Sequence, residues 1–195
     1  MKRFLFILLC LPLCTYSQSK EEQLAVKYSV KYKLPLMKRM LKKTLPKSYM
    51  VYYSDNAYRV EFTSSFSMLG IKIKIEGLQI DNYEQLKSLT LASIIAEKDK
   101  EAKDTTDHTL EDIWIDTVSK ITYTQETKTI LGNKCVGFFI ENEDSKIEGF
   151  LTTRYSAIGA IIDGMDYGLP MYLEEYDKKE GITEFLTVES IDIEP

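Results

Sequence analysis

The sequence predicts a mainly β fold, an antiparallel meander of roughly eight to eleven strands with one or two short helices. Two patterns lead to this prediction. Apolar and polar residues alternate with a period of two along several segments, as they do in strands with one buried and one solvated face. Clusters of Gly, Asn, Asp and Ser separate these segments at short intervals, which is typical of β-hairpin turns.

The strand patterns begin early in the chain. Residues 26–33 give the clearest one, with Val and Tyr at every second position and Lys or Ser between them. Residues 49–53 and 58–62 flank the turn-forming sequence at 54–57 and predict a hairpin. Isoleucine alternates with lysine over 71–75, which predicts another half-buried strand.

The middle of the chain is harder to assign. Leu91, Ile94 and Ile95 fit one face of a helix as well as a strand, and we favour a strand followed by a charged loop. Over residues 96–112, ten of the seventeen residues are charged and Leu110 is the one large apolar residue. Such a stretch buries too little surface to offset its ordering entropy, so we expect a flexible charged loop.

The carboxyl-terminal part returns to alternating strand patterns and turns. A strand that begins near Ile121 is expected to turn at Gly132 and Asn133. Further strands are expected at 135–141, 147–153, 171–175 and 183–193.

The composition excludes several classes of function. The 195 residues include 25 Lys and Arg against 30 Asp and Glu, which gives a formal charge of −5. Such an acidic chain lacks the basic excess that neutralises phosphate, so we expect no nucleic-acid partner. One histidine and three cysteines leave little for His- or Cys-based catalysis or metal binding. We therefore expect no catalytic residues, no metal site and no cofactor.

The first 17 residues have the pattern of an export signal. A basic start at 1–3 precedes an apolar run at 4–14, which is shorter than the about 20 residues that a membrane-spanning helix needs. Small residues lead to the bond between Ser17 and Gln18, where we expect cleavage. The sequence thus predicts a periplasmic or secreted protein with one β-rich domain over 18–195 and peripheral membrane contact at most.

Lipidation at Cys10 or Cys14 is the alternative processing. A bulky leucine precedes each of these cysteines where lipidation favours a small residue, so we prefer simple cleavage. After cleavage Cys135 is the one remaining cysteine. The exported domain would then form no internal disulfide and would depend on its core for stability.

Three short motifs carry a family resemblance. They are Ile-Leu-Gly-Asn-Lys-Cys at 130–135, Gly-Phe-Leu-Thr-Thr at 149–153 and Tyr-Gly-Leu-Pro at 167–170. In this order they resemble the exported GLPGLI family and the related domain-of-unknown-function 4412 family, although Met-Tyr-Leu at 171–173 replaces the final Gly-Leu-Ile. Both families are similar in architecture to periplasmic lipoprotein-carrier (outer-membrane lipoprotein-sorting) proteins. The resemblance implies a curved, half-open β-barrel with an apolar cavity and a binding role.

Residues 34–47 combine apolar and basic side chains between Pro35 and Pro46. One interpretation is a short amphipathic lid over the barrel mouth that contacts ligand or anionic lipid headgroups. The other, which we favour, is a connecting helix whose apolar side caps the core and whose lysines are solvated. The residues expected to make the ligand or membrane contact of the lid are Met37, Lys38, Arg39, Met40, Leu41, Lys42 and Lys43.

Cys135 and His108 are the candidates for chemistry, and for both we favour a structural interpretation. Cys135 lies among apolar residues, which predicts a small buried core side chain rather than a thiolate nucleophile. His108 lies among carboxylates that suit calcium or zinc, but their spacing matches no EF-hand. We expect a solvated acidic loop there.

Two functions remain after these exclusions. The leading one is an exported non-enzymatic binding protein that holds a lipid or other apolar ligand in a concave β-sheet, where burial contributes roughly 0.8 kcal/mol per CH₂. The alternative is a structural or envelope-assembly protein that docks a protein partner and has no ligand cavity.

Overall fold

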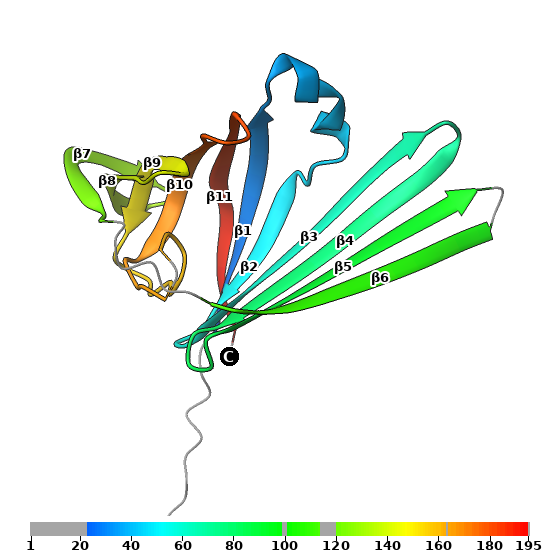
Figure 1. Cartoon of the computed structure of the whole chain (residues 1–195). Helices are drawn as coiled ribbons and strands as arrows, with labels where there is room; N and C mark the ends of the chain where they lie inside the picture. The colour runs from blue at the N-terminus through cyan, green and yellow to red at the C-terminus, as the bar shows by residue number, and fades with distance from the viewer. Residues whose placement is uncertain (1–22, 99–100, 114–119, 163, 195) are drawn as a thin grey trace, which may run out of the picture.

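All the described strands belong to one antiparallel sheet, which curves strongly without closing on itself (Figure 1). The structure, a computed structural model, describes residues 23–98, 101–113, 120–162 and 164–194. The expected cleavage site at Ser17 and Gln18 therefore lies outside the described residues. The strands are β1 (Gln23–Lys33), β2 (Ser48–Tyr53), β3 (Ala57–Met68), β4 (Ile71–Asn82), β5 (Lys87–Lys98), β6 (Glu101–Asp112), β7 (Thr122–Ile130), β8 (Asn133–Glu141), β9 (Ser145–Thr152), β10 (Leu169–Asp177) and β11 (Ile182–Glu194).

The first and last strands lie together at the centre of the sheet. The strand order is β6-β5-β4-β3-β2-β1-β11-β10-β9-β8-β7, so two meanders extend from the central β1–β11 pair. This order confirms the predicted antiparallel meander and its open, curved form. One short 3₁₀ helix, η1 (Leu36–Lys43), connects β1 to β2 within the described part of the chain.

Residues 96–112 do not form the flexible loop that their charge predicts. β5 continues to Lys98, and β6 pairs with it from Glu101 to Asp112. β6 is an edge strand whose side chains from 104 to 112 are all exposed, so no buried face imposes an apolar alternation on the sequence. Charged side chains on an edge strand also oppose unwanted pairing with other chains.

The core lies on the concave face of the central strands. Val26, Leu151, Leu169 and Met171 are fully buried there. Leu169 of the Tyr-Gly-Leu-Pro motif is buried on β10, and so are Met171 and Leu173, which follow the motif. The motif therefore supplies core packing.

The segment 153–168 covers the lower part of this concave face. Its Ala157 and Ile162 are buried in the two core clusters. Gly159 lies so close to Tyr83, beside the β4–β5 turn, that an added Cβ would be 2.1 Å from the tyrosine oxygen. The segment thus fills the concave side from β9 and β10 across to the β4–β5 turn.

The strands β3–β6, here called the arm, extend beyond this core as a single layer (Figure 1). The extensive contacts of these strands are with their neighbours in the sheet. Apolar residues change face at Gly77: Ile73 and Ile75 precede it on the concave face, and Leu78 and Ile80 follow it on the convex face. The Phe62 ring covers Gly77, where an added Cβ would lie 2.2 Å from the ring.

Candidate ligand-binding face

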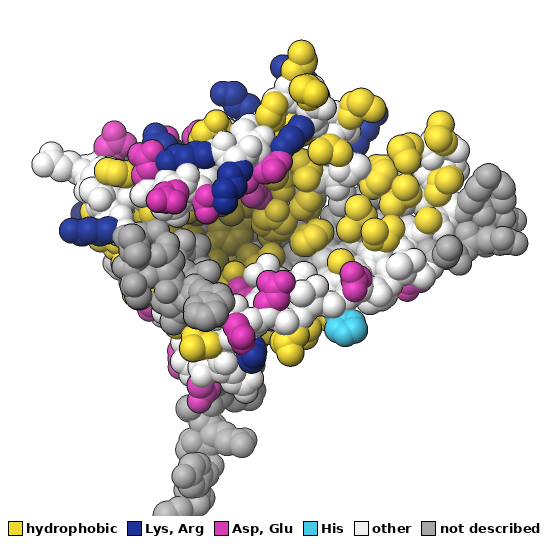
Figure 2. Space-filling view, viewed as in Figure 1, with side chains coloured by type: hydrophobic (Ala, Val, Ile, Leu, Met, Phe, Trp, Pro, Cys, Tyr) yellow, Lys and Arg dark blue, Asp and Glu magenta, His cyan; other side chains and the backbone are white. Residues whose placement is uncertain are grey.

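The concave face of the arm carries an uncovered apolar surface, here called the arm patch. The strand register places its side chains on the same face as the core. Figure 2 shows hydrophobic side chains along the hollowed face of the molecule and on the arm. The arm patch consists of Phe62, Phe66, Met68, Ile71, Ile73, Ile75 and Ile94.

The arm patch is half-buried to exposed although its residues are apolar. Met68 is 56% exposed and Ile94 is 47% exposed, while Phe66 and Ile73 are half-buried. Beside the patch, the buried Ser64 donates a 3.4 Å hydrogen bond to the Leu45 carbonyl of the η1–β2 connection. A contiguous, partly exposed apolar surface of this kind is a candidate interaction site.

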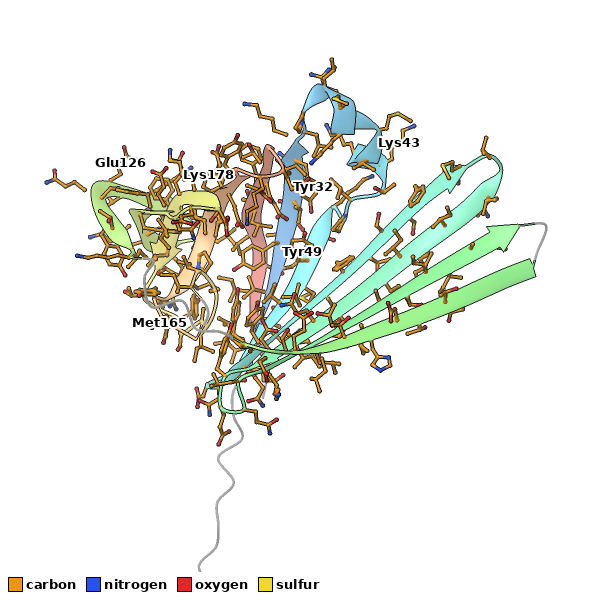
Figure 3. All side chains as sticks on the ribbon, viewed as in Figure 1. Tyr32, Lys43, Tyr49, Glu126, Met165 and Lys178 are labelled. Atoms are coloured by element: carbon orange, nitrogen blue, oxygen red, sulfur yellow. The ribbon has the colours of Figure 1, made fainter. Side chains whose placement is uncertain are left out.

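A polar cluster lies beside the arm patch on the concave face. Tyr32 donates a 3.1 Å hydrogen bond to Glu184, and its hydroxyl lies 2.8 Å from the hydroxyl of Tyr49 (Figure 3). Tyr49 in turn packs edge-on against Phe62, with ring centroids 6.0 Å apart. The cluster therefore places polar groups on the concave face next to the apolar arm patch.

Two carboxylates belong to this polar cluster. Glu175 on β10 is the register partner of Glu184 on β11. Burial raises the pKa of both glutamates, and the negative charge of Glu184 raises that of Glu175 further. Hydrogen bonds from Tyr49 and Tyr32 partly oppose the rise in the pKa of Glu184. Among the described side chains, neither carboxylate forms an ion pair.

η1 does not cap the core, which contradicts the interpretation favoured from the sequence. None of its residues is buried, and Met37 and Met40 are 94% and 89% exposed. In a 3₁₀ helix residues three apart line up, so Met37 and Met40 share a row with Lys43, while Lys38 shares another with Leu41. The more protected Lys38 pairs with Glu180 and fixes η1 to the β10–β11 turn.

A shallow groove of about 450 Å³ lies on the convex face, away from the arm patch. Phe138, Phe139, Phe150 and Tyr172 line it together with glutamates and Lys146, which pairs with Glu148 at 3.0 Å. The groove combines aromatic and charged side chains but has no continuity with the concave face.

Cys135 and His108 occupy the positions that a structural interpretation expects. Cys135 is buried in the core, its thiol donates to the Asn133 carbonyl at 3.3 Å, and burial raises its pKa. His108 is exposed on β6 opposite Leu91. In the described ranges, no group of three or more His, Cys, Asp or Glu side chains is placed to hold a metal ion.

Sequence reasoning missed the arm patch as a surface and the pair Glu175 and Glu184 altogether. The signal for the pair is present: Glu175 follows Met171 and Leu173 at alternate positions, and Glu184 precedes Leu186 in the same way. Acidic residues at core-facing positions on both sides of one turn therefore meet on the concave face.

Comparison with known proteins gives no family assignment. No family model matches the sequence, and no curated protein matches it. The resemblance to the GLPGLI and domain-of-unknown-function 4412 families therefore stays a prediction.

Comparison with solved structures finds matches of low structural similarity. The chain is similar to PNGF-II in two crystal forms, with 12% identity and a TM-score of 0.42 over 89% of this chain and 28–29% of PNGF-II. It is also similar to an outer-membrane lipoprotein-sorting protein domain from Vibrio parahaemolyticus, with 7% identity and a TM-score of 0.22 over 89% of this chain and 86% of that domain. The chain thus spans less than a third of PNGF-II. These values are too low to assign a ligand or an activity.

The described part of the chain contains no helix with the length and apolar character needed to cross a bilayer.

Proposed function

We propose that the chain is an exported, non-enzymatic binding protein that holds an apolar ligand, such as the acyl chain of a lipid, against the arm patch. The observation that carries this proposal is the single-layer arm, whose concave face presents Phe66, Ile73 and Ile94 without a covering element in the described structure. Burying these side chains under a ligand is favourable at about 25 cal/mol per Å² of apolar surface.

The neighbouring groups favour an amphiphile over a purely apolar ligand. The arm patch contacts Tyr49, whose hydroxyl lies 2.8 Å from that of Tyr32, and η1 places Lys43 at the same end of the sheet as the β3–β4 tip (Figures 1 and 3). An acyl chain along the patch would thus have polar and basic groups within reach of an acidic headgroup.

Two matched variants test this proposal. Ile73 and Ile95 are both half-buried isoleucines on the arm, but Ile73 faces the concave side and Ile95 the convex side. We expect Ile73→Asn to weaken binding of a fluorescent long-chain fatty acid about 5- to 30-fold, the equivalent of about 1–2 kcal/mol. Ile95→Asn should leave it nearly unchanged. Equal affinities in both variants would contradict the proposal.

A second candidate is a structural or envelope-assembly role in which the chain docks a protein partner. The observation that favours it is the open edge of β6, a strand of twelve residues in which alternate residues direct backbone groups away from β5 without a partner strand in the described structure. Native mass spectrometry after gentle purification distinguishes the two roles. A co-purifying lipid supports ligand binding, whereas an empty chain recovered with a protein partner supports assembly.

A further inference from the structure

Two exposed apolar prongs stand at the same end of the sheet (Figure 1). One is η1, and the other is the tip of the β3–β4 hairpin at residues 68–70. Leu69 at this tip is 91% exposed, and its neighbour Gly70 has no atom within 4 Å of the position of an added Cβ. Segments far apart in the chain thus bring large apolar side chains to one rim: Leu36, Met37, Met40, Met68 and Leu69.

Leu69 also has an unusual backbone conformation. Its φ is +52°, a left-handed value that is uncommon for residues other than glycine. A bulky apolar residue there gains no packing in the described structure, because its side chain points to solvent. A single exposed leucine needs no explanation, but a second group of exposed apolar side chains on η1, at the same end of the sheet, does.

Positive charge is concentrated in the part of the chain that contains η1. The chain is acidic, yet residues 23–54 contain eight Lys or Arg and no Asp or Glu. Residues 62–75 contain two lysines and no acidic residue. Lys38 is paired with Glu180, but no carboxylate of the described residues pairs with Arg39, Lys42 or Lys43. Unpaired positive charge therefore surrounds the apolar side chains of η1, whereas near the β3–β4 tip Lys74 pairs with Glu76 and Lys72 lies opposite Glu97.

We propose that η1 and the β3–β4 tip together form a docking rim for the surface of an anionic lipid bilayer. Met37, Met40 and Leu69 insert among the headgroups, and Arg39, Lys42 and Lys43 contact the anionic lipids. The rim consists of two projecting tips, η1 and the β3–β4 turn, that lie apart from each other. Narrow tips of this shape can insert into the headgroup layer of a bilayer. The proposal does not depend on ligand binding at the arm patch.

The test is vesicle co-sedimentation of the chain from Gln18 onward, which contains all described elements. Residues 4–14 are omitted because this apolar run would itself enter a bilayer. The probe is vesicles of equal parts phosphatidylglycerol and phosphatidylcholine, compared with phosphatidylcholine alone. We expect binding to the anionic vesicles that weakens as salt is added.

Two variants examine the two prongs separately. The combined change Arg39→Glu, Lys42→Glu and Lys43→Glu should lower partitioning more than about 100-fold, since each lost basic residue contributes about fivefold. Leu69→Ser should lower partitioning about tenfold although it alters no charge and lies outside η1.

Each variant has a control elsewhere on the sheet. Leu131 has φ +47° before Gly132 in a hairpin turn and is 55% exposed, so Leu131→Ser matches Leu69→Ser in type and conformation. The control for the charge reversal on η1 is the combined change Lys120→Glu, Lys128→Glu and Lys134→Glu near β7 and β8.

No binding of the unaltered chain to anionic vesicles, as would follow if the rim instead docked an acidic protein, would overturn the proposal. Equal loss in Leu69→Ser and Leu131→Ser would overturn it as well.

Discussion

Glu175 and Glu184 lie directly opposite each other on β10 and β11, on the concave face beside the apolar core. Burial raises the pKa of both carboxyl groups, and each occupies a position that continues a row of inward-facing apolar residues. This arrangement costs stability when both groups are charged, because two like charges share a partly dehydrated site.

The first prediction concerns the pH dependence of this pair. With raised folded pKa values, the folded state binds protons more tightly than the unfolded state, so stability falls as pH rises from the ordinary glutamate range through the folded values. Glu175→Gln removes one charge, and we expect its melting temperature to exceed that of the unaltered chain by about 2–4 °C at pH 7.5. The difference should vanish near pH 4. Glu174→Gln, its convex neighbour, is the control, and an equal gain in both would contradict the interpretation.

The second prediction tests how the segment 153–168 is attached. Gly159 has φ +71° and contacts Tyr83, whereas Gly70 has φ +79° and open space around it. Both Gly→Ala changes carry the conformational cost of about 1 kcal/mol, but Gly159→Ala adds a steric clash of about 1–3 kcal/mol. We expect Gly159→Ala to lower the free energy of unfolding by the larger amount and to increase hydrogen exchange in 153–168. Equal effects of the two changes would show that the Tyr83 contact is unimportant.

The third prediction concerns Asp166 in the same segment. Burial alone would raise its pKa, but hydrogen bonds from the Ser156 hydroxyl and from the backbone N–H groups of Gly168 and Ala157 hold it below the ordinary value. The stability from these bonds is present above the ordinary aspartate pKa and is lost as pH falls through the lowered folded pKa. Asp166→Asn should cost about 1 kcal/mol at pH 7, a modest amount because solvent screens the exposed carboxylate.

Urea unfolding at pH 7 and at low pH measures this effect. The cost of Asp166→Asn should shrink at low pH, where the aspartate is also neutral. Asp55→Asn in the β2–β3 turn is the control, and a pH-independent cost at Asp166 would contradict the assignment.

The fourth prediction concerns the thiol. Cys135 is 1% exposed and burial raises its pKa, so its thiolate is both scarce and inaccessible in the folded chain. A thiol reagent should modify the native protein at least about 100-fold more slowly than the protein in urea. Rapid modification of the native protein would instead indicate a reactive, accessible cysteine.

The sequence predicted most of the sheet because alternation survives wherever one face is buried. β1, β2, β3 and the strands β8–β11 follow this pattern. β6 was missed because neither face of an edge strand is buried from 104 to 112, and the face change at Gly77 is invisible to a count of alternating residues. The arm patch also escaped prediction, since the sequence shows apolar residues but not that they lack a covering layer.

For η1, the sequence predicted an amphipathic helix but placed its apolar side wrongly. Met37, Met40 and Leu41 have α-helical spacing in the sequence, which led to the expectation of an apolar side on the core. Pro35 and Pro46 confine the segment, and the short connection forms a 3₁₀ helix that turns its methionines to solvent. Local spacing therefore indicated an amphipathic element but not the direction of its apolar side.

The proposal that an apolar ligand lies along the arm patch is tested most directly by photo-crosslinking. A long-chain fatty acid with a diazirine group near its methyl end is bound, irradiated and located by residue-resolved mass spectrometry. The account predicts labelling of concave residues such as Phe66, Ile73 and Ile94, with none at the convex Leu91 and Ile95. Labelling concentrated in the convex groove around Phe139 and Tyr172, or equal labelling of both faces of the arm, would contradict it.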